Sequence, residues 1–140
     1  MADTFFTRTF DLATGSRETV LDITDRCAAF LSDTAAGRDG LLNVFVPHAT
    51  AGIAVIETGA GSDDDLLAAL EGLLPPDDRW RHRHGSRGHG RDHVLPALVA
   101  PHATLPVVDG RLALGTWQSV VLVDTNRDNP RRTVRMSFLG

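Results

Sequence analysis

One short segment of the chain, residues 79–93 (RWRHRHGSRGHGRDH), concentrates imidazole and guanidinium groups. It contains four of the six histidines and five of the fourteen arginines. Neutral imidazole is a good ligand for zinc and similar divalent metals, and three ligands with an open fourth position form a catalytic site. The segment therefore suggests a metal site, although its spacing matches neither a zinc finger nor H-E-x-x-H. The alternative, a solvated arginine-rich loop with incidental histidines, stays open.

Three other positions carry candidate chemistry. His48 in VPHATAG follows an apolar run, and strand ends commonly hold site residues, although a lone histidine there is often structural. The tetrapeptide GTWQ, residues 115–118, has a glycine that would allow a ligand close to the backbone, but a tryptophan inside a strand is more often part of the core. The segment DNPRR, residues 128–132, has two arginines that suit a phosphate or carboxylate, although exposed loop arginines usually contact only water.

The elements that must position these residues follow from hydropathy and turn signals. Threonine-rich, aromatic or apolar runs predict strands, helical spacing of apolar residues predicts helices, and Asp109-Gly110 predicts a tight hairpin turn. Three aspartates at 63–65 suit the first turn of a helix that Ser62 can cap. We expect about seven strands (4–12, a short one near 17–20, 41–48, 51–58, 103–108, 111–124 and 131–140) and two to three helices (22–34, 61–76 and 92–101). Without strict alternation of strand and helix, this order predicts an α+β fold with a largely antiparallel sheet.

Length and composition limit the classes of protein. The 140 residues suit a single domain, residues 1–140, and 42% hydrophobic residues are ordinary for a globular chain. The net charge of −4 argues against a general nucleic-acid or membrane-surface binder. The single cysteine, Cys27, fits a small buried apolar side chain. The sequence has neither a signal peptide nor an apolar run of membrane-spanning length, so we expect a cytoplasmic protein.

Together these segments resemble the YjbQ family, also called UPF0047 or the secondary thiamine-phosphate synthase enzyme family. The resemblance covers nearly the whole chain in order, through PHATAGIAVIET, the loop 79–93, DHVLPAL, LPVVDGRLALGTWQSVVLVD and NPRRTVRMSF. It departs at His102, where the family usually has serine. The resemblance implies two packed sheets and a homotrimer with sites in clefts at or near the subunit boundaries.

The resemblance also implies particular site residues. Three histidines of the family's cleft match His48, His82 and His93, which we predict to bind a divalent metal, with zinc expected. The predicted catalytic residues are His48, Glu57 and Asp65, with Asp64 as an alternative to Asp65 because of a one-residue gap. The predicted contacts to a substrate or anion are Thr50, Trp80, Thr116, Trp117, Gln118 and Arg131. Trp80 replaces a family tyrosine, and neither His84 nor His89 has a clear family counterpart.

The activity implied by the resemblance is weak thiamine-phosphate synthesis, in which a metal and arginines would neutralise the pyrophosphate leaving group. We expect a small trimeric protein whose three-histidine metal or anion site handles a small phosphorylated metabolite, or phosphate or sulfate itself. Two alternatives remain: a metal-assisted phosphoester hydrolase, and a non-catalytic module that binds a metal or a phosphorylated metabolite. Neither a nucleic acid nor a membrane is an expected partner.

Overall fold

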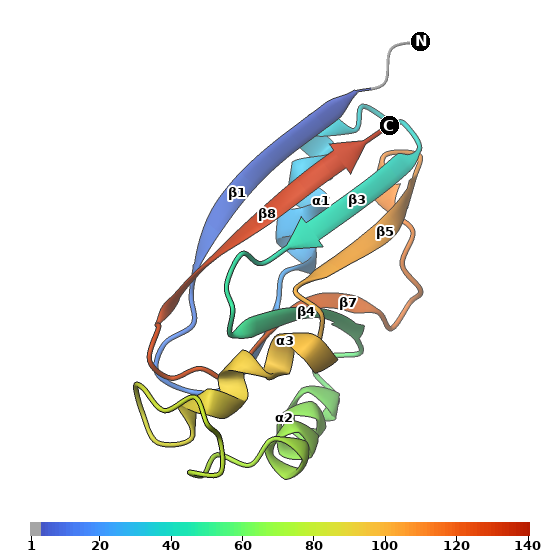
Figure 1. Cartoon of the computed structure of the whole chain (residues 1–140). Coiled ribbons are helices and arrows are strands. Elements are labelled where there is room, and N and C mark those ends of the chain that lie inside the picture. Colours follow the sequence, from blue (N-terminus) through green and yellow to red (C-terminus); the bar gives the residue numbers. More distant parts are fainter. Residues whose placement is uncertain (1–3) are drawn as a thin grey trace.

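The computed structural model describes residues 4–140, in which eight strands form two antiparallel sheets (Figure 1). The five-stranded sheet has the order β1 (Phe5–Ala13), β8 (Arg131–Leu139), β3 (Gly40–Phe45), β5 (His102–Val108) and β6 (Arg111–Leu112). The three-stranded sheet has the order β2 (Thr19–Asp22), β7 (Ser119–Asp124) and β4 (Ala51–Ile56). The helices are α1 (Thr24–Thr34), α2 (Ser62–Leu73) and α3 (Leu95–Leu98), with a 3-10 helix, η1 (His89–His93), before α3. The predicted α+β fold of two packed antiparallel sheets is thus confirmed.

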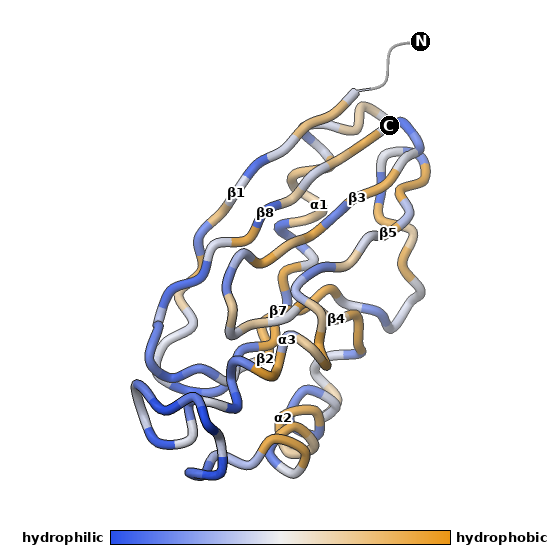
Figure 2. The backbone as a smooth tube through the Cα atoms, viewed as in Figure 1, coloured by the Kyte–Doolittle hydropathy of each residue, from blue (hydrophilic) through white to orange (hydrophobic). Residues whose placement is uncertain are grey.

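Two hydrophobic clusters lie on the two faces of the three-stranded sheet. On one face, α1 and the inner side of the five-stranded sheet close the larger cluster around Leu122. On the other face, α2 and α3 pack Leu70 and Leu95 against Val121 and Val123. Because both faces of β7 are covered, its sequence is a continuous apolar run rather than an alternating one. Figure 2 shows the contrast with the hydrophilic loop between α2 and α3.

In β8, by contrast, buried and accessible side chains alternate along the strand. Arg132 shares the buried side of β8 with Val134, Met136 and Phe138. Its guanidinium makes two hydrogen bonds to Asp124 at the end of β7, at 2.6 and 3.0 Å, and each side chain is 1% exposed. This buried ion pair joins the two sheets beside the start of β4, since Ala51 pairs with Asp124.

The segment 111–124 is not the single strand that its apolar residues predict. The strand β6 ends at Leu112 and β7 begins at Ser119. Between them, the backbone amide of Gly115 donates to the side-chain oxygen Oε1 of Gln118 at 2.8 Å. The backbone amide of Gln118 donates to the Gly115 carbonyl at 3.1 Å. The side chain of Gln118 thus accepts the hydrogen bond that a neighbouring strand would otherwise accept. Trp117 is 73% exposed rather than part of the core.

Local details also differ from the expectations at two helices. The predicted helix 92–101 is divided into η1 and α3, with Pro96 at the start of α3, where a missing amide hydrogen costs least. Ser62 does not cap α2, because the residue before the helix is Gly61 with φ +102° and no side chain caps the first turn.

Cys27 is fully buried as expected, and burial raises the pKa of its thiol to about 12. No helix within residues 4–140 is long and apolar enough to span a membrane.

Candidate functional site

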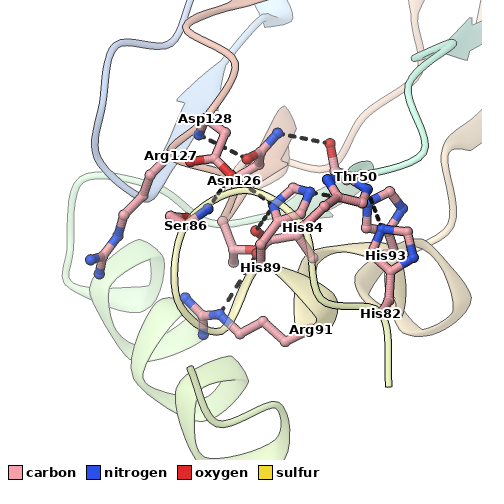
Figure 3. A network of polar contacts seen from close by, with 12 residues as sticks. Thr50, His82, His84, Ser86, His89, Arg91, His93, Asn126, Arg127 and Asp128 are labelled. Carbon is pink, nitrogen blue, oxygen red and sulfur yellow. Dashed lines mark hydrogen bonds and ion pairs between the residues drawn. The ribbon is translucent and has the colours of Figure 1, made fainter. Parts of the chain in front are cut away.

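Four histidines of the loop and of η1 converge on one point (Figure 3). One ring nitrogen from each of His82, His84, His89 and His93 lies within 4.8 Å of the others. His89 Nε2 and His93 Nε2 are 3.1 Å apart, and His82 Nε2 contacts His84 Nε2. In a tetrahedral zinc site with Zn–N bonds of about 2.0–2.1 Å, the nitrogens are separated by about 3.3 Å. The four imidazoles therefore supply the type of donor that a divalent metal prefers, gathered around one point.

The buried carboxylate of Asp92 orients the imidazole of His89. His89 Nδ1 donates to Asp92 Oδ2 at 3.1 Å, and the opposite carboxylate oxygen accepts a 2.6 Å hydrogen bond from Thr125 Oγ1. Asp128 Oδ2 lies 3.3 Å from the same His89 nitrogen. With the proton on Nδ1, the lone pair of Nε2 faces the other histidines. A carboxylate that fixes the tautomer in this way is typical of metal-binding histidines.

Two glycines allow the loop to close around the histidines. Gly85 has φ +76°, and a Cβ atom there would lie 2.3 Å from Asp128 Oδ2, the acceptor of the Ser86 amide at 2.9 Å. At Gly90, a Cβ atom would lie 2.5 Å from both the His82 carbonyl oxygen and Trp80 Cβ. Glycine is therefore favoured at residue 85 by its positive φ, and at residue 90 by the close approach of the His82 backbone and of Trp80.

The electrostatics favour the neutral imidazole at His93. Burial lowers the pKa of His93, the nearby His82, His89 and His84 lower it further, and Asp92 opposes the shift. The pKa of Asp128 is lowered, with the hydrogen bond from the Ser86 amide as the first cause. A neutral imidazole beside an ionised carboxylate is the protonation state that a metal ligand needs.

An open pocket of about 360 Å³ lies beside the cluster, and His48 lines it together with His84, His89 and His93. The structure places His48 beside the group of four rather than within it. Its Nε2 accepts a 2.9 Å hydrogen bond from the Thr133 amide, which leaves Nδ1 as the nitrogen available to a ligand.

The base of this pocket is a closed polar network. Thr50 Oγ1 accepts hydrogen bonds from Arg132 at 2.8 Å and from the Asn126 side chain at 3.2 Å. Both donors are buried, and Arg132 is already paired with Asp124. Thr50 is therefore engaged within the protein, and the network fixes the wall of the pocket.

Three of the five arginines in residues 79–93 form ion pairs. Arg91 pairs with Glu18, Arg79 with Asp77 and Arg87 with Asp78, while Arg83 donates to the carbonyls of Asp78 and Trp80. Among the arginines of the described chain, only Arg132 lines the pocket, and its charge is matched by Asp124. Within the described chain, the arginines therefore offer this pocket no unpaired positive charge.

The other predicted residues lie elsewhere. Glu57 follows β4, and Gln118 precedes β7, at the end opposite to Ala51 and Asp124. With a rise of about 3.3 Å per residue, the length of β4 separates them from the histidine pocket by roughly 20 Å in one chain. Thr116 and Trp117 belong to the same distant turn.

The remaining three lie nearer to the loop or on its flanks. Trp80 donates from Nε1 to the Pro75 carbonyl at 2.8 Å, which anchors the start of the loop. Asp65 lies in the first turn of α2. Arg131 is exposed at the start of β8.

Of the predicted metal ligands, His82 and His93 lie in the cluster, whereas His84 and His89 were not predicted as ligands. Their signal was present in the sequence, because residues 82 and 84 alternate along an extended segment and residues 89 and 93 lie one helical turn apart. Spacing alone could not show that the two pairs face each other.

The fold and this histidine cluster define a small α+β protein with a candidate metal centre. Residues 8–140 match the family described as UPF0047 protein YjbQ-like, and the chain belongs to this family. It is 63% identical over 124 residues to the UPF0047 protein Rv2556c of Mycobacterium tuberculosis. The aligned region covers 89% of this chain and 91% of that protein. It is also 32% identical over 139 residues to the UPF0047 protein YugU of Bacillus subtilis. That alignment covers 95% of this chain and 98% of YugU.

Solved structures share the fold. A hypothetical protein of Aeropyrum pernix has a TM-score of 0.85 and 35% identity, over 96% of this chain and 98% of that one. A YbjQ-like protein of unknown function from Sulfolobus solfataricus has a TM-score of 0.91 over 99% of each chain, at 24% identity.

Proposed function

We propose that the chain is a divalent-metal protein, with zinc expected, that presents its metal to a small phosphorylated ligand. The histidines that would hold the metal are His82, His84, His89 and His93. The observation that carries the proposal is the convergence of four ring nitrogens within 4.8 Å, supported by the Asp92 carboxylate on His89. The metal would supply the positive charge that binds a phosphate oxygen and stabilises charge on a leaving group.

The residues of the adjacent pocket would orient such a ligand. His48 Nε2 accepts the hydrogen bond from the Thr133 amide, so its Nδ1–H is available to donate a hydrogen bond to the ligand. Burial is the main cause that lowers the pKa of His48, Arg132 lowers it further, and Asp124 opposes this. His48 is therefore neutral near pH 7, with its hydrogen on Nδ1, and is suited to donate a hydrogen bond to a ligand oxygen. The weak thiamine-phosphate synthase activity implied by the family resemblance, or phosphoester hydrolysis, would use this pocket.

A second candidate function is a binding module without turnover. Four imidazoles around one metal form a closed set, and closed four-ligand sites are typically structural, whereas catalytic sites keep one position open. Storage of a metal or sensing of a metabolite would fit a closed set.

We also propose a homotrimer, as the family resemblance implies. Within residues 4–140, no helix or strand covers the outer face of the five-stranded sheet (Figure 1), and its register aligns the exposed side chains of Phe5, Leu41 and Leu139 across three strands. An uncovered apolar row of this kind suits a second copy of the chain. Sedimentation or light scattering that gave only the monomer mass would exclude the trimer.

Metal analysis of the purified full chain tests the central proposal. We expect about one zinc per chain after purification without chelator, and loss of that metal in His89→Ala. The matched control is His102→Ala, an exposed histidine on β5 outside the cluster, which should keep full metal content. A wild-type chain that fails to bind zinc or cobalt at micromolar concentration would refute the metal centre. Metal retention without turnover on a panel of phosphate esters and thiamine precursors would favour the binding module.

A further inference from the structure

We infer that His84 is an exchangeable ligand of the metal centre, whereas His82, His89 and His93 form its fixed part. When His84 leaves, the coordination position that it vacates faces the pocket lined by His48, and a phosphate oxygen takes it. This inference rests on the proposed metal centre. It would also reconcile a four-imidazole set with a function that needs an open position.

The first support is the difference in how the imidazoles are held. His89 is buried, with hydrogen-bonding carboxylates beside its Nδ1, and it lies on η1 next to His93. His84 is exposed, and its contact with His82 Nε2 is the one hydrogen bond of its side chain among residues 4–140. A ligand that lacks an oriented second nitrogen loses little when it rotates away.

The second support separates His84 from its neighbour His82, which is also exposed. The His82 carbonyl packs closely against Gly90, and its ring centroid lies 4.1 Å from that of His93. Within residues 4–140, the backbone groups of neither His82 nor His84 make a hydrogen bond. The close approach of the His82 backbone to Gly90 is therefore the contact that holds residue 82 in place.

The third support is the direction in which the centre would open. His84, His89 and His93 line the 360 Å³ pocket together with His48, whereas His82 lines only the hollow beside Trp80. Withdrawal of His84 thus exposes the metal position to the pocket, and withdrawal of His82 would expose it elsewhere. The same pocket contains Asn126 and Asn129, polar groups suited to a small anion.

Cobalt(II) in place of zinc makes the coordination visible, because its absorption depends on the number and type of ligands. We expect the cobalt-loaded wild-type chain to show the strong visible bands of a tetrahedral site. His84→Ala should still bind one cobalt per chain, with affinity lowered by no more than about 100-fold and with altered bands. His89→Ala should lose cobalt binding at the same concentration, and circular dichroism should show that both variants fold.

Titration with inorganic phosphate gives the decisive readout. If His84 must leave before phosphate binds, part of the binding free energy is spent on its displacement, so His84→Ala should bind phosphate more tightly than wild type. His82→Ala, the matched control, should not. Free imidazole should restore the wild-type bands of His84→Ala and should compete with phosphate.

The outcomes separate the two proposals. A wild-type chain that binds no cobalt refutes the metal centre itself. Cobalt binding with unchanged bands and unchanged phosphate affinity in His84→Ala refutes the exchange and leaves the centre intact. Complete loss of cobalt from His84→Ala would show that His84 is an obligatory ligand, which also refutes the exchange.

Discussion

The two ends of the β4–β7 strand pair differ in how their side chains are held. At the end where Ala51 pairs with Asp124, contacts between distant segments hold the buried polar groups, from Arg132 to the Asp92 carboxylate beside His89. At the other end, Gln118 bonds within its own four-residue turn and Trp117 points into solvent. The comparison teaches that long-range contacts hold side chains for chemistry, whereas a local turn leaves its residues available to a partner.

The largest loss of stability should follow from breaking the buried ion pair of Arg132 and Asp124. Replacing Asp124 by alanine leaves the Arg132 guanidinium buried without a counter-charge, which costs about 3–5 kcal/mol. The free energy of unfolding in urea measures this. In the exposed pair of Arg8 and Asp33, Asp33→Ala should cost at most about 1 kcal/mol. Equal losses at the two pairs would contradict the assignment of the buried pair.

Asp92→Asn should weaken metal binding by about 10–100-fold, because the imidazole of His89 loses the charge that fixes its tautomer and basicity. Competition with a metal indicator measures the affinity. Glu57→Gln, at the opposite end of β4, should leave it unchanged. An effect at Glu57 as large as that at Asp92 would show that the two ends act together, as they would if a neighbouring copy brought them into one cleft.

Gly90→Ala should destabilise the chain by about 1–3 kcal/mol, since the added methyl group overlaps with Trp80 and the His82 carbonyl. Gly72→Ala on α2 is the matched control, because its Cβ meets nothing within 4 Å and alanine favours a helix by up to about 1 kcal/mol. Thermal melts of the two variants should therefore shift in opposite directions. A Gly90→Ala chain as stable as wild type would mean that the loop packs differently.

The stability of the metal-free chain should fall as the pH drops below about 6.5, the ordinary pKa of histidine. The pKa of His48 is lowered in the folded chain, chiefly by burial, so the unfolded chain binds more protons in this range and acid favours unfolding. Protonation of Nε2 would also abolish its acceptance of the Thr133 amide. His48→Gln should reduce the slope between pH 7.5 and 5.5. An identical slope would assign the pH dependence to other groups.

Trp117→Ala should have the smallest effect on the isolated chain, within about 0.5 kcal/mol, because a side chain that is 73% exposed contributes little to packing. A core tryptophan would cost about 3–5 kcal/mol. The melting temperature at low protein concentration distinguishes these values. A loss that grows with protein concentration would place Trp117 in an interface between copies.

Patterns that depend on neighbouring residues were read correctly from the sequence. The strand at 131–140 and the tight turn at Asp109-Gly110, with φ of +50° and +75°, agree with the prediction. The prediction of a single strand at 111–124 was wrong, because the side chain of Gln118 closes a turn that apolar composition does not reveal.

The sequence by itself determined an α+β fold with largely antiparallel strands, because hydropathy along strands and helices repeats at fixed short periods, and it concentrated the histidines in one loop. The two packed sheets were what the family resemblance implied. Only the tertiary structure decided that His84 and His89 join His82 and His93, that His48 stands beside them, and that the arginines are used elsewhere. These outcomes depend on contacts between residues tens of positions apart. Thr125 fixes Asp92 across 33 positions, and Asp128 fixes Ser86 across 42. No local period encodes such distances, so the chemistry of the site was set when the chain folded.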